Sequence, residues 1–285
     1  MLLTRGRRMV MPRVGADPVV SPGLTTYYAT ECDNYLVPDG GPGVLVPPSV
    51  LPAAGTQAGE NLRTITMLAD ESGYGSNYTV FPYNPGQADG PNAVRTPIVQ
   101  PHLNSPSGYA MRIRVDNLGS GQDVLRGQSH VILGGQGTKQ KLHVRMYFAV
   151  PIAFDFPDIA KYIRFWGPGH VDCGVFIIAA NDKWQFGADG QQFGAYAQST
   201  VGPTKDNQFH HTEVMIDWSL GTTLTVAMWY DQVQIMSATR AVQSFTAGIR
   251  EVEIFGTFNN RAVWVTPVDF YYSRIKMANE YIGTL

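Results

Sequence analysis

The stretch His211–Met236 reads HTEVMIDWSLGTTLTVAMWYDQVQIM and decides the fold class. On each side of its SLGT segment, apolar residues recur at every second position. This alternation is typical of antiparallel strands that bury one face, and SLGT itself predicts a turn. The apolar set is Val214, Ile216 and Trp218 before the turn, and Leu224, Val226, Met228 and Tyr230 after it.

The same alternation occurs in MRIRV (111–115) and KLHVRMYFAV (141–150). About ten strands in the second part of the chain cannot stay in one open twisted sheet, so two packed sheets are expected. We therefore predict an all-β, two-sheet antiparallel jelly-roll sandwich over residues 107–285. Further strands are expected at KYIRFW, CGVFIIAA, KWQFG, VQIMSA, REVEIFGTF and VDFYYSRIKM.

Residues 1–106 have a different composition, with fourteen of the nineteen prolines of the chain. Proline fixes φ and removes a backbone donor, which predicts an extended or turned segment. Apolar residues such as Tyr27, Leu36 and Val44 are too frequent for a free linker. We interpret 1–106 as a proline-rich extended arm that lies on its own sandwich or on a neighbouring subunit. Its basic tip is either solvated or docks on an acidic neighbour or on nucleic acid, and consists of Arg5, Arg7, Arg8 and Arg13.

Composition excludes several broad classes. The formal charge of -2, with 15% charged residues, gives no general attraction to nucleic acid or to an anionic membrane. The start lacks the apolar region of a secretory signal, and no apolar run is long enough to span a bilayer. We therefore expect synthesis in a cytoplasm. Cys32 and Cys173 are expected as buried free thiols, with a disulfide as the alternative.

An ordered set of segments in residues 161–285 resembles the concanavalin A-like jelly rolls, which include lectins, laminin G-like modules, glucanases and polysaccharide lyases. The segments are KYIRFWGPG, VFIIAANDKWQFG, HHTEVMIDWSLGTTLTVAMWYDQVQIM and VDFYYSRIKMANEYIG. In the third segment Gln232 replaces the usual glycine of a hairpin turn. The resemblance implies glycan binding on the concave face or the loop rim. The arm followed by a sandwich also resembles, in style, auxiliary structural proteins of tailed phages.

Exposed indoles offer apolar faces to sugar rings, so tryptophans are candidates for glycan contacts. Trp218 alternates in phase with Val214 and is expected in the core, whereas Trp229 faces the other side of its strand. Core packing is the alternative for every tryptophan. The glycan-binding candidates, chosen beside turns or out of the apolar phase, are Trp166, Trp184, Trp229 and Asp231.

Three polar side chains at alternate positions, His143, Arg145 and Tyr147, share one strand face. A lyase acting on uronic acids needs a cation for the carboxylate and a histidine or tyrosine to move protons. A solvated strand face explains the same pattern. Glu251 and Glu253 also share a face, at a separation within the range of glycosidase carboxylates, and surface glutamates are the alternative. We assign no catalytic residue.

No cofactor and no metal site are expected. The oxygen donors that calcium could take from separate turns are Asp172, Asn181, Asp182 and Asp189, and turn chemistry explains them equally well.

Three hypotheses follow. The first is a non-enzymatic structural component of a virion: the arm docks on copies of the chain and on a major capsid or tail protein, and the sandwich is displayed, with glycan binding as an added role. The second is a polysaccharide lyase or glycoside hydrolase. The third is a carbohydrate-binding module.

Overall fold

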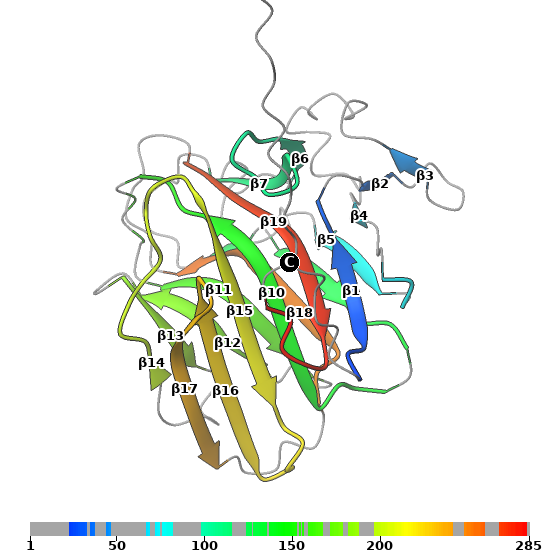
Figure 1. Cartoon of the computed structure of the whole chain (residues 1–285), viewed down its shortest axis with the longest axis vertical. Coiled ribbons are helices and arrows are strands. Elements are labelled where there is room, and N and C mark those ends of the chain that lie inside the picture. Colours follow the sequence, from blue (N-terminus) through cyan, green and yellow to red (C-terminus); the bar gives the residue numbers. More distant parts are fainter. Residues whose placement is uncertain are drawn as a thin grey trace, which may run out of the picture.

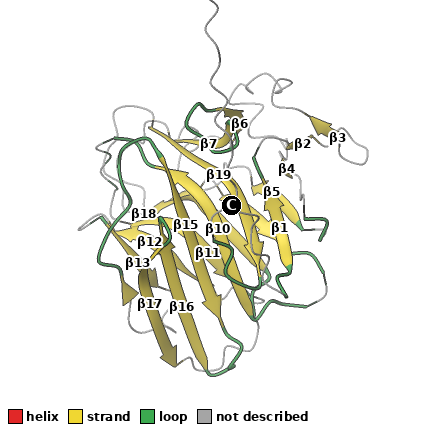
Figure 2. Ribbon diagram, viewed as in Figure 1, coloured by secondary structure: helices red, strands yellow, loops and turns green. Residues whose placement is uncertain are grey.

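A computed structural model describes residues 23–32, 35–37, 44–46, 67–68, 72–74, 76–81, 98–115, 124–126, 128–135, 137–152, 154, 156, 159–167, 172–178, 182–187, 197–241, 248–259 and 268–283. The described residues form strands and loops without a helix (Figure 2). Accordingly, this part of the chain holds no helix that is long and apolar enough to cross a membrane.

Two eight-stranded antiparallel sheets make up the sandwich (Figure 1). The sheet nearer the viewer in Figure 1, here the front sheet, has the order β17 (Val233–Ala241), β16 (Thr223–Tyr230), β15 (Phe209–Asp217), β10 (Lys141–Ala149), β19 (Val268–Ala278), β7 (Tyr109–Val115) and β6 (Ile98–Pro101), with β1 (Thr26–Thr30) also paired to β19.

The back sheet has an equivalent layout. Its order is β14 (Ala197–Gln198), β13 (Lys183–Gly187), β12 (Asp172–Ile178), β11 (Ile159–Trp166), β18 (Glu251–Asn259), β9 (Gln128–Ile132) and β5 (Asn77–Phe81), with β8 (Val124–Arg126) paired to β18. A small third sheet has the order β3 (Val44–Val46), β2 (Tyr35–Val37) and β4 (Met67–Leu68).

One hydrophobic core lies between the two large sheets. Val214, Ile216 and Trp218 are buried, as their alternation predicted. Phe148 of the front sheet packs edge-on against Tyr162 of the back sheet, with ring centroids 4.9 Å apart. The Tyr162 hydroxyl lies 2.6 Å from the Thr212 hydroxyl, which donates to the Met146 carbonyl oxygen. This contact satisfies a buried phenol, and burial raises its pKa.

Strands from the first 106 residues belong to these sheets. β1 pairs with β19, β5 with β9, and β6 with β7. Part of the proline-rich segment therefore lies on its own sandwich as strands, which is one of the two interpretations of the arm. The basic tip Arg5, Arg7, Arg8 and Arg13 lies outside the described residues. The Cys32 thiol is buried and forms no disulfide within the described part of the chain.

The turn between β16 and β17 has Gln232 at the position where such a hairpin usually has a glycine. Asp231 and Gln232 both have positive φ, at 45° and 69°. A left-handed conformation costs an L-residue about 1–2 kcal/mol, and glycine avoids that cost. Gln232→Gly is therefore expected to raise the free energy of unfolding by about 1 kcal/mol, measured by urea denaturation.

The matched control is Gln234→Gly, two residues further along in β17, outside the positive-φ turn. Glycine inside a strand weakens it, so this variant is expected to be less stable than the parent chain. Equal effects at positions 232 and 234 would contradict the strain at Gln232.

Candidate functional site

A row of charged and aromatic side chains crosses four neighbouring strands of the front sheet. Lys276 in β19 is directly opposite Arg145 in β10, and Arg145 is opposite Glu213 in β15. Glu213 is in turn opposite Trp229 in β16. Directly opposed residues of paired strands project from the same face. Their neighbours Val144, Val214 and Met228 are in the core, so the row lies on the outer face.

Residues two positions along each strand extend this row. His143 and Tyr147 flank Arg145 on β10, and His211 lies opposite Tyr147. The resulting front-face cluster consists of His143, Arg145, Tyr147, His211, Glu213, Trp229 and Lys276. The predicted grouping of His143, Arg145 and Tyr147 is thus present. However, His143 and Arg145 are buried, so a solvated strand face does not describe them.

Glu213 is the hub of the cluster and is 0% exposed. Its Oε1 accepts hydrogen bonds from His143 Nδ1 at 2.8 Å and from the Ile282 backbone N–H at 2.9 Å. Its Oε2 accepts one from the Gly283 N–H at 3.0 Å. A buried carboxylate requires such donors, because desolvation of an unpaired charge is strongly unfavourable. Glu213 therefore joins the sheet to the segment that follows β19.

Arg145 is also buried, at 2% exposure, but its hydrogen bonding is incomplete. Its Nε and Nη1 have no hydrogen-bond partner in the described part of the chain. Burial lowers its pKa, while Tyr147 and Glu213 act in the opposite direction. Arginine nevertheless stays charged near neutral pH. The cluster thus contains a buried cation with N–H donors able to bind a carboxylate.

His211 complements Arg145 as an acceptor. It is 3% exposed, and burial lowers its pKa, so the neutral imidazole is favoured. Its Nε2 lies 3.2 Å from the Gly283 carbonyl oxygen and must carry the proton to donate there. Its Nδ1 then has a bare lone pair, without a partner among the described residues. The Tyr147 ring meets the imidazole edge-on at 5.5 Å.

Acidification is expected to destabilise the protein through His211. The unfolded histidine titrates near pH 6.5 at about its ordinary pKa, and burial lowers the folded pKa below that value. Below about pH 6.5 the unfolded state binds more protons than the folded state, so the free energy of unfolding falls as the pH falls. Urea titrations at several pH values should show this slope, and it should be shallower in His211→Gln. If the dependence of the unfolding free energy on pH were unchanged in that variant, other groups would cause it. One such group is His102, because burial lowers its pKa as well.

Aromatic side chains form one rim of the cluster. Trp229 stacks on His143 at 6.1 Å between ring centroids, and Tyr281 approaches Trp229 at 5.0 Å. Trp229 is half-buried and Tyr281 is 43% exposed. Trp229 therefore faces away from the core, as its phase predicted. Sequence reasoning missed Tyr281, because it follows the last strand and belongs to no periodic pattern.

A β-bulge in β19 sets the position of Lys276. Between Ser273, opposite Tyr147, and Lys276, opposite Arg145, β19 has one more residue than β10. The extra residue is accommodated around Arg274, whose φ is 50°. Arg274 Nε donates to Glu31 Oε2 at 2.6 Å. Bulges of this kind redirect side chains and are frequent beside functional sites.

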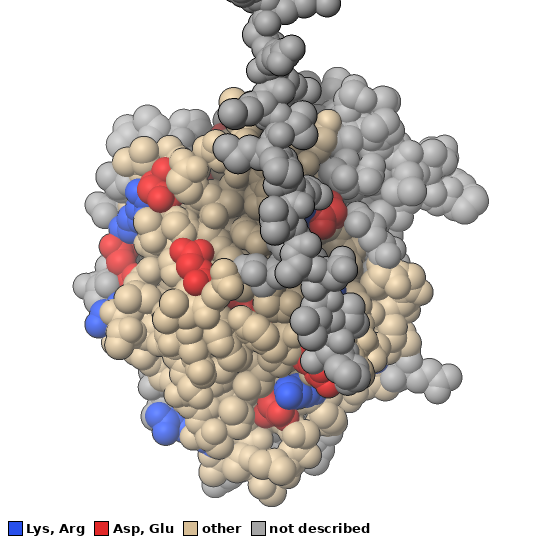
Figure 3. All heavy atoms as spheres, in the orientation of Figure 1, with Lys and Arg blue, Asp and Glu red and all other residues tan. Residues whose placement is uncertain are grey.

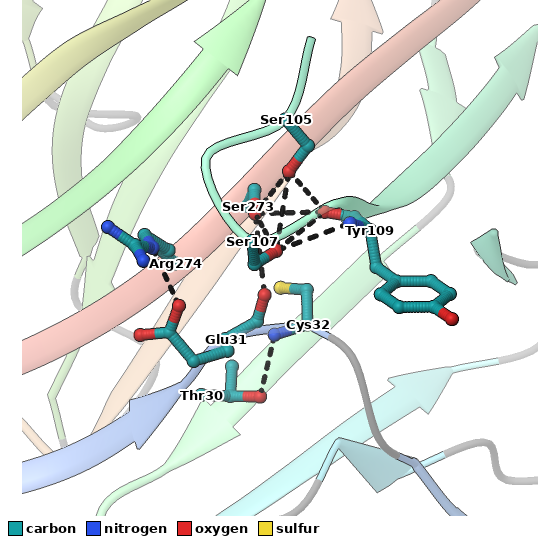
Figure 4. Close-up of polar contacts among 8 residues, drawn as sticks. All are labelled: Thr30, Glu31, Cys32, Ser105, Ser107, Tyr109, Ser273 and Arg274. Atoms are coloured by element: carbon teal, nitrogen blue, oxygen red, sulfur yellow. Dashed lines mark hydrogen bonds and ion pairs between the residues drawn. The ribbon is translucent and has the colours of Figure 1, made fainter. Parts of the chain in front are cut away.

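Hydroxyl groups fix the strand beside the bulge (Figure 4). Ser273 lies 2.9 Å from Ser105 and 3.0 Å from Ser107, hydroxyl to hydroxyl, and donates to the Tyr109 carbonyl oxygen at 3.0 Å. This serine group joins the turn before β7 to β19, where β1 replaces β7 as the neighbour of β19. The front-face cluster is therefore built on a braced strand.

The remaining glycan-binding candidates lie elsewhere. Trp184 is 0% exposed and packs against Tyr162, so its prediction as an exposed platform was wrong; core packing outweighs the nearby turn residues. Trp166 lies on the outer face of the back sheet, with Nε1 donating to Glu253 at 3.2 Å. Asp231 is in the β16–β17 turn and accepts hydrogen bonds from His210 Nδ1 and the His211 N–H.

The glutamate pair on β18 also needs a correction. Glu253 is buried, and its Oε2 accepts a hydrogen bond from Arg164 Nη1 at 2.9 Å. It is an ion-paired residue of the back sheet, so the expectation of surface glutamates was wrong at this position. Glu251 bonds His130 Nδ1.

The loop oxygen donors considered for calcium are only partly within the described residues. Asp182 pairs with Lys205 Nζ at 2.5 Å, and Asp172 lies in β12. Asn181 and Asp189 fall outside the described ranges. Among the residues that are described, no group of three His, Cys, Asp or Glu side chains could hold a metal ion.

No protein-family model and no curated protein matches the chain. Solved structures do. One is the cellulose-induced protein Cip1, with 12% identity, coverage of 71% of this chain and 92% of that chain, and a TM-score of 0.51. Another is an endo-β-1,4-glucuronan lyase from the fungus Trichoderma reesei, with 11% identity, 65% and 87% coverage and a TM-score of 0.49.

A third similar structure is that of botulinum neurotoxin type C, whose cell entry is described as dependent on two ganglioside molecules. The identity is 11%, the coverage is 78% of this chain and 47% of that chain, and the TM-score is 0.46. At such identities, likeness shows the fold alone. The concanavalin A-like jelly roll that the sequence predicted is thus confirmed as a fold, on the likeness to Cip1.

Proposed function

We propose that the chain binds an acidic polysaccharide on the outer face of its front sheet. The observation that carries this proposal is the buried Arg145, whose Nε and Nη1 have no hydrogen-bond partner within the described residues. A guanidinium donates strong, charge-assisted N–H···O bonds to a carboxylate, and the hexuronic acids of such polysaccharides carry one carboxylate per residue. Lys276, directly opposite Arg145, adds a second cation.

The surroundings of the cluster favour a sugar over other anionic polymers. On the face shown in Figure 3, charged side chains of the described residues are few and scattered among uncharged ones. A nucleic-acid surface would need many cations to contact successive phosphates. Trp229 supplies an apolar ring face beside His143, which suits the C–H face of a pyranose.

Replacing Arg145 is expected to weaken binding of polyuronates by about 10- to 100-fold, because charge-assisted hydrogen bonds contribute about 1.5–3 kcal/mol. Affinity electrophoresis in gels containing polygalacturonate, alginate or neutral xylan measures this for Arg145→Met. Arg240→Met, an exposed residue on β17, is the matched control and should bind as the parent chain does. The proposal would be wrong if the polyuronate gels retarded Arg145→Met as strongly as the parent chain. It would also be wrong if the parent chain bound neutral xylan as tightly as it binds the polyuronates.

Polysaccharide lyase activity is the second candidate. It is favoured by His211, whose Nδ1 has no hydrogen-bond partner among the described residues and whose ring contacts Tyr147. In such a reaction, Arg145 would neutralise the uronate carboxylate while a base removes the C5 proton. The C4–O bond breaks as the C4–C5 double bond forms, and the leaving oxygen takes a proton. His211 is the candidate base because the Tyr147 ring meets its imidazole edge-on. His143 is the alternative base, because Glu213 holds the proton on His143 Nδ1 and leaves its Nε2 as the acceptor.

The discriminating measurement is the ultraviolet absorbance of unsaturated uronate ends. Binding without any rise in absorbance supports a binding protein. A rise that Tyr147→Phe and His211→Gln each abolish, while polyuronate binding is retained, supports the lyase. Dependence on His143 but not on His211 would reverse the assignment of the base.

The role in particle assembly stays a prediction. It depends on the basic tip of the arm and on partners that would be copies of the chain and a capsid or tail protein. Because β1 begins at Thr26 and pairs with β19, deletion of residues 1–20 leaves every described strand in place. Loss of particle incorporation in this variant, with unchanged folding, is the expected result; unchanged incorporation would remove the assembly hypothesis.

A further inference from the structure

The segment after β19, residues 279–283, returns across the front-face cluster; we name it the strap. Its start is fixed, because the Asn279 side chain accepts a hydrogen bond from the Thr25 N–H at 2.6 Å and donates to the Gly23 carbonyl oxygen at 3.0 Å. Figure 1 shows the chain turning back over the sheet after β19. The strap is thus held at one end by the loop that precedes β1.

The other end of the strap bonds two polar side chains at the centre of the cluster. The Ile282 and Gly283 N–H groups donate to Glu213, and the Gly283 carbonyl oxygen accepts from His211 Nε2. Tyr281 places its ring 5.0 Å from Trp229 and 6.3 Å from His143. These contacts are those an extended ligand would make: polar groups toward Glu213 and His211, and a ring toward Trp229.

The strap is only partly buried, although it makes these hydrogen bonds. Tyr281 is 43% exposed, and Ile282 and Gly283 are half-buried. Glycine at 283 has a φ of 66° and adds no side-chain contact. Segments with few buried apolar contacts open locally at free energies far below that of global unfolding. The strap can therefore leave the cluster while β19 stays paired.

We propose that the strap is an autoinhibitory segment that occupies the glycan site and must be released before His211 and Glu213 meet a ligand. This inference rests on the proposed function for its biological meaning, but occlusion itself can be measured without any glycan. A ligand competing with the strap would bind more weakly than its own contacts allow, since part of the population has the site closed.

The test uses the reaction of histidines with diethyl pyrocarbonate, followed residue by residue by mass spectrometry. Two variants release the strap in different ways: deletion of residues 280–285, and Tyr281→Ala, which leaves the Glu213 bonds available. We expect His211 to react at least tenfold faster in both than in the full chain. His102, outside the strap contacts, is the internal reference and should react at one rate throughout. Equal His211 rates in all three proteins would overturn the inference.

Binding assays on the same proteins separate this inference from the proposed function. Faster His211 modification together with tighter binding of polygalacturonate supports both. If His211 is modified faster but no variant binds any polyuronate, glycan binding is wrong, and autoinhibition is wrong with it. The occlusion of His211 by the strap would still be supported. Binding of polygalacturonate by the full chain at the affinity of the deletion variant overturns the autoinhibitory role alone. Circular dichroism of each variant excludes unfolding as the cause of faster modification.

Discussion

Replacing Glu213 with alanine is expected to lower the free energy of unfolding by about 3–5 kcal/mol, the loss typical when one partner of a buried ionic network is removed. Glu213 is fully buried and accepts three hydrogen bonds, from His143, Ile282 and Gly283. Without it, these donors lose their acceptor, and the positive charge of Arg145 loses its buried counter-charge in the opposite strand position. Urea denaturation followed by tryptophan fluorescence measures the loss.

Glu213→Gln is the matched control for this prediction. It retains one carbonyl oxygen and the side-chain shape, but removes the charge and turns one acceptor into a donor facing an N–H group. An intermediate loss is expected, smaller than for alanine. A loss below about 1 kcal/mol for Glu213→Ala, in the range of exposed pairs, would show that the network contributes little.

Replacing Gly202 with alanine is expected to cost about 3 kcal/mol, at the upper end of the range for overpacked sites. A Cβ at position 202 would lie 1.4 Å from the Asp182 carbonyl oxygen and 2.7 Å from its carbon, and both are backbone atoms that cannot rotate away. The segment around Gly202 is tied to the same turn by Ser199 N–H, which donates to the Trp184 carbonyl oxygen at 2.8 Å, and by the Lys205–Asp182 pair. Relief of the clash therefore requires these contacts to break.

Gly221→Ala separates steric overlap from the loss of a flexible residue. Gly221 has a φ of 69°, but a methyl group added there would meet no atom within 4 Å among the described residues. The only expected cost of alanine at this position is then that of the left-handed backbone conformation, about 1–2 kcal/mol in the free energy of unfolding. Thermal unfolding of the two variants should rank Gly202→Ala as the less stable. The reverse order would contradict the close approach of the two backbones.

Alternation along single strands was sufficient to predict most of the sandwich. The period of two placed Val214, Ile216 and Trp218 in the core, and KWQFG matches the bounds of β13 (Lys183–Gly187). Alternation failed to predict burial where contacts between distant strands determine it. Trp184 is buried because the opposite sheet and Tyr162 enclose it, which no local pattern indicates. In the proline-rich segment, β1 pairs with β19 and β5 with β9, which lie far away in the sequence.

The candidate site was predictable only within one strand. Because successive positions alternate faces, His143, Arg145 and Tyr147 could be placed together from β10 alone. Their partners come from strands far away in sequence: Glu213 is 70 residues from His143. Strand order and register decide which residues are opposite Arg145, and the bulge at Arg274 shifts the phase of β19. Sequence spacing contains neither piece of information.

The position of β19 and β18 has a consequence for biosynthesis. Among the described strands these two come last in the chain, yet each occupies the middle of its sheet, between β10 and β7 and between β11 and β9. During translation, the strands that flank each gap emerge first and leave the ribosome with unpaired edges. Such edges are prone to intermolecular pairing. Neither sheet can close, and the row across β19, β10, β15 and β16 cannot form, until residues 251–278 have been synthesised. Stalled or truncated nascent chains that lack this segment should therefore depend on chaperones to remain soluble.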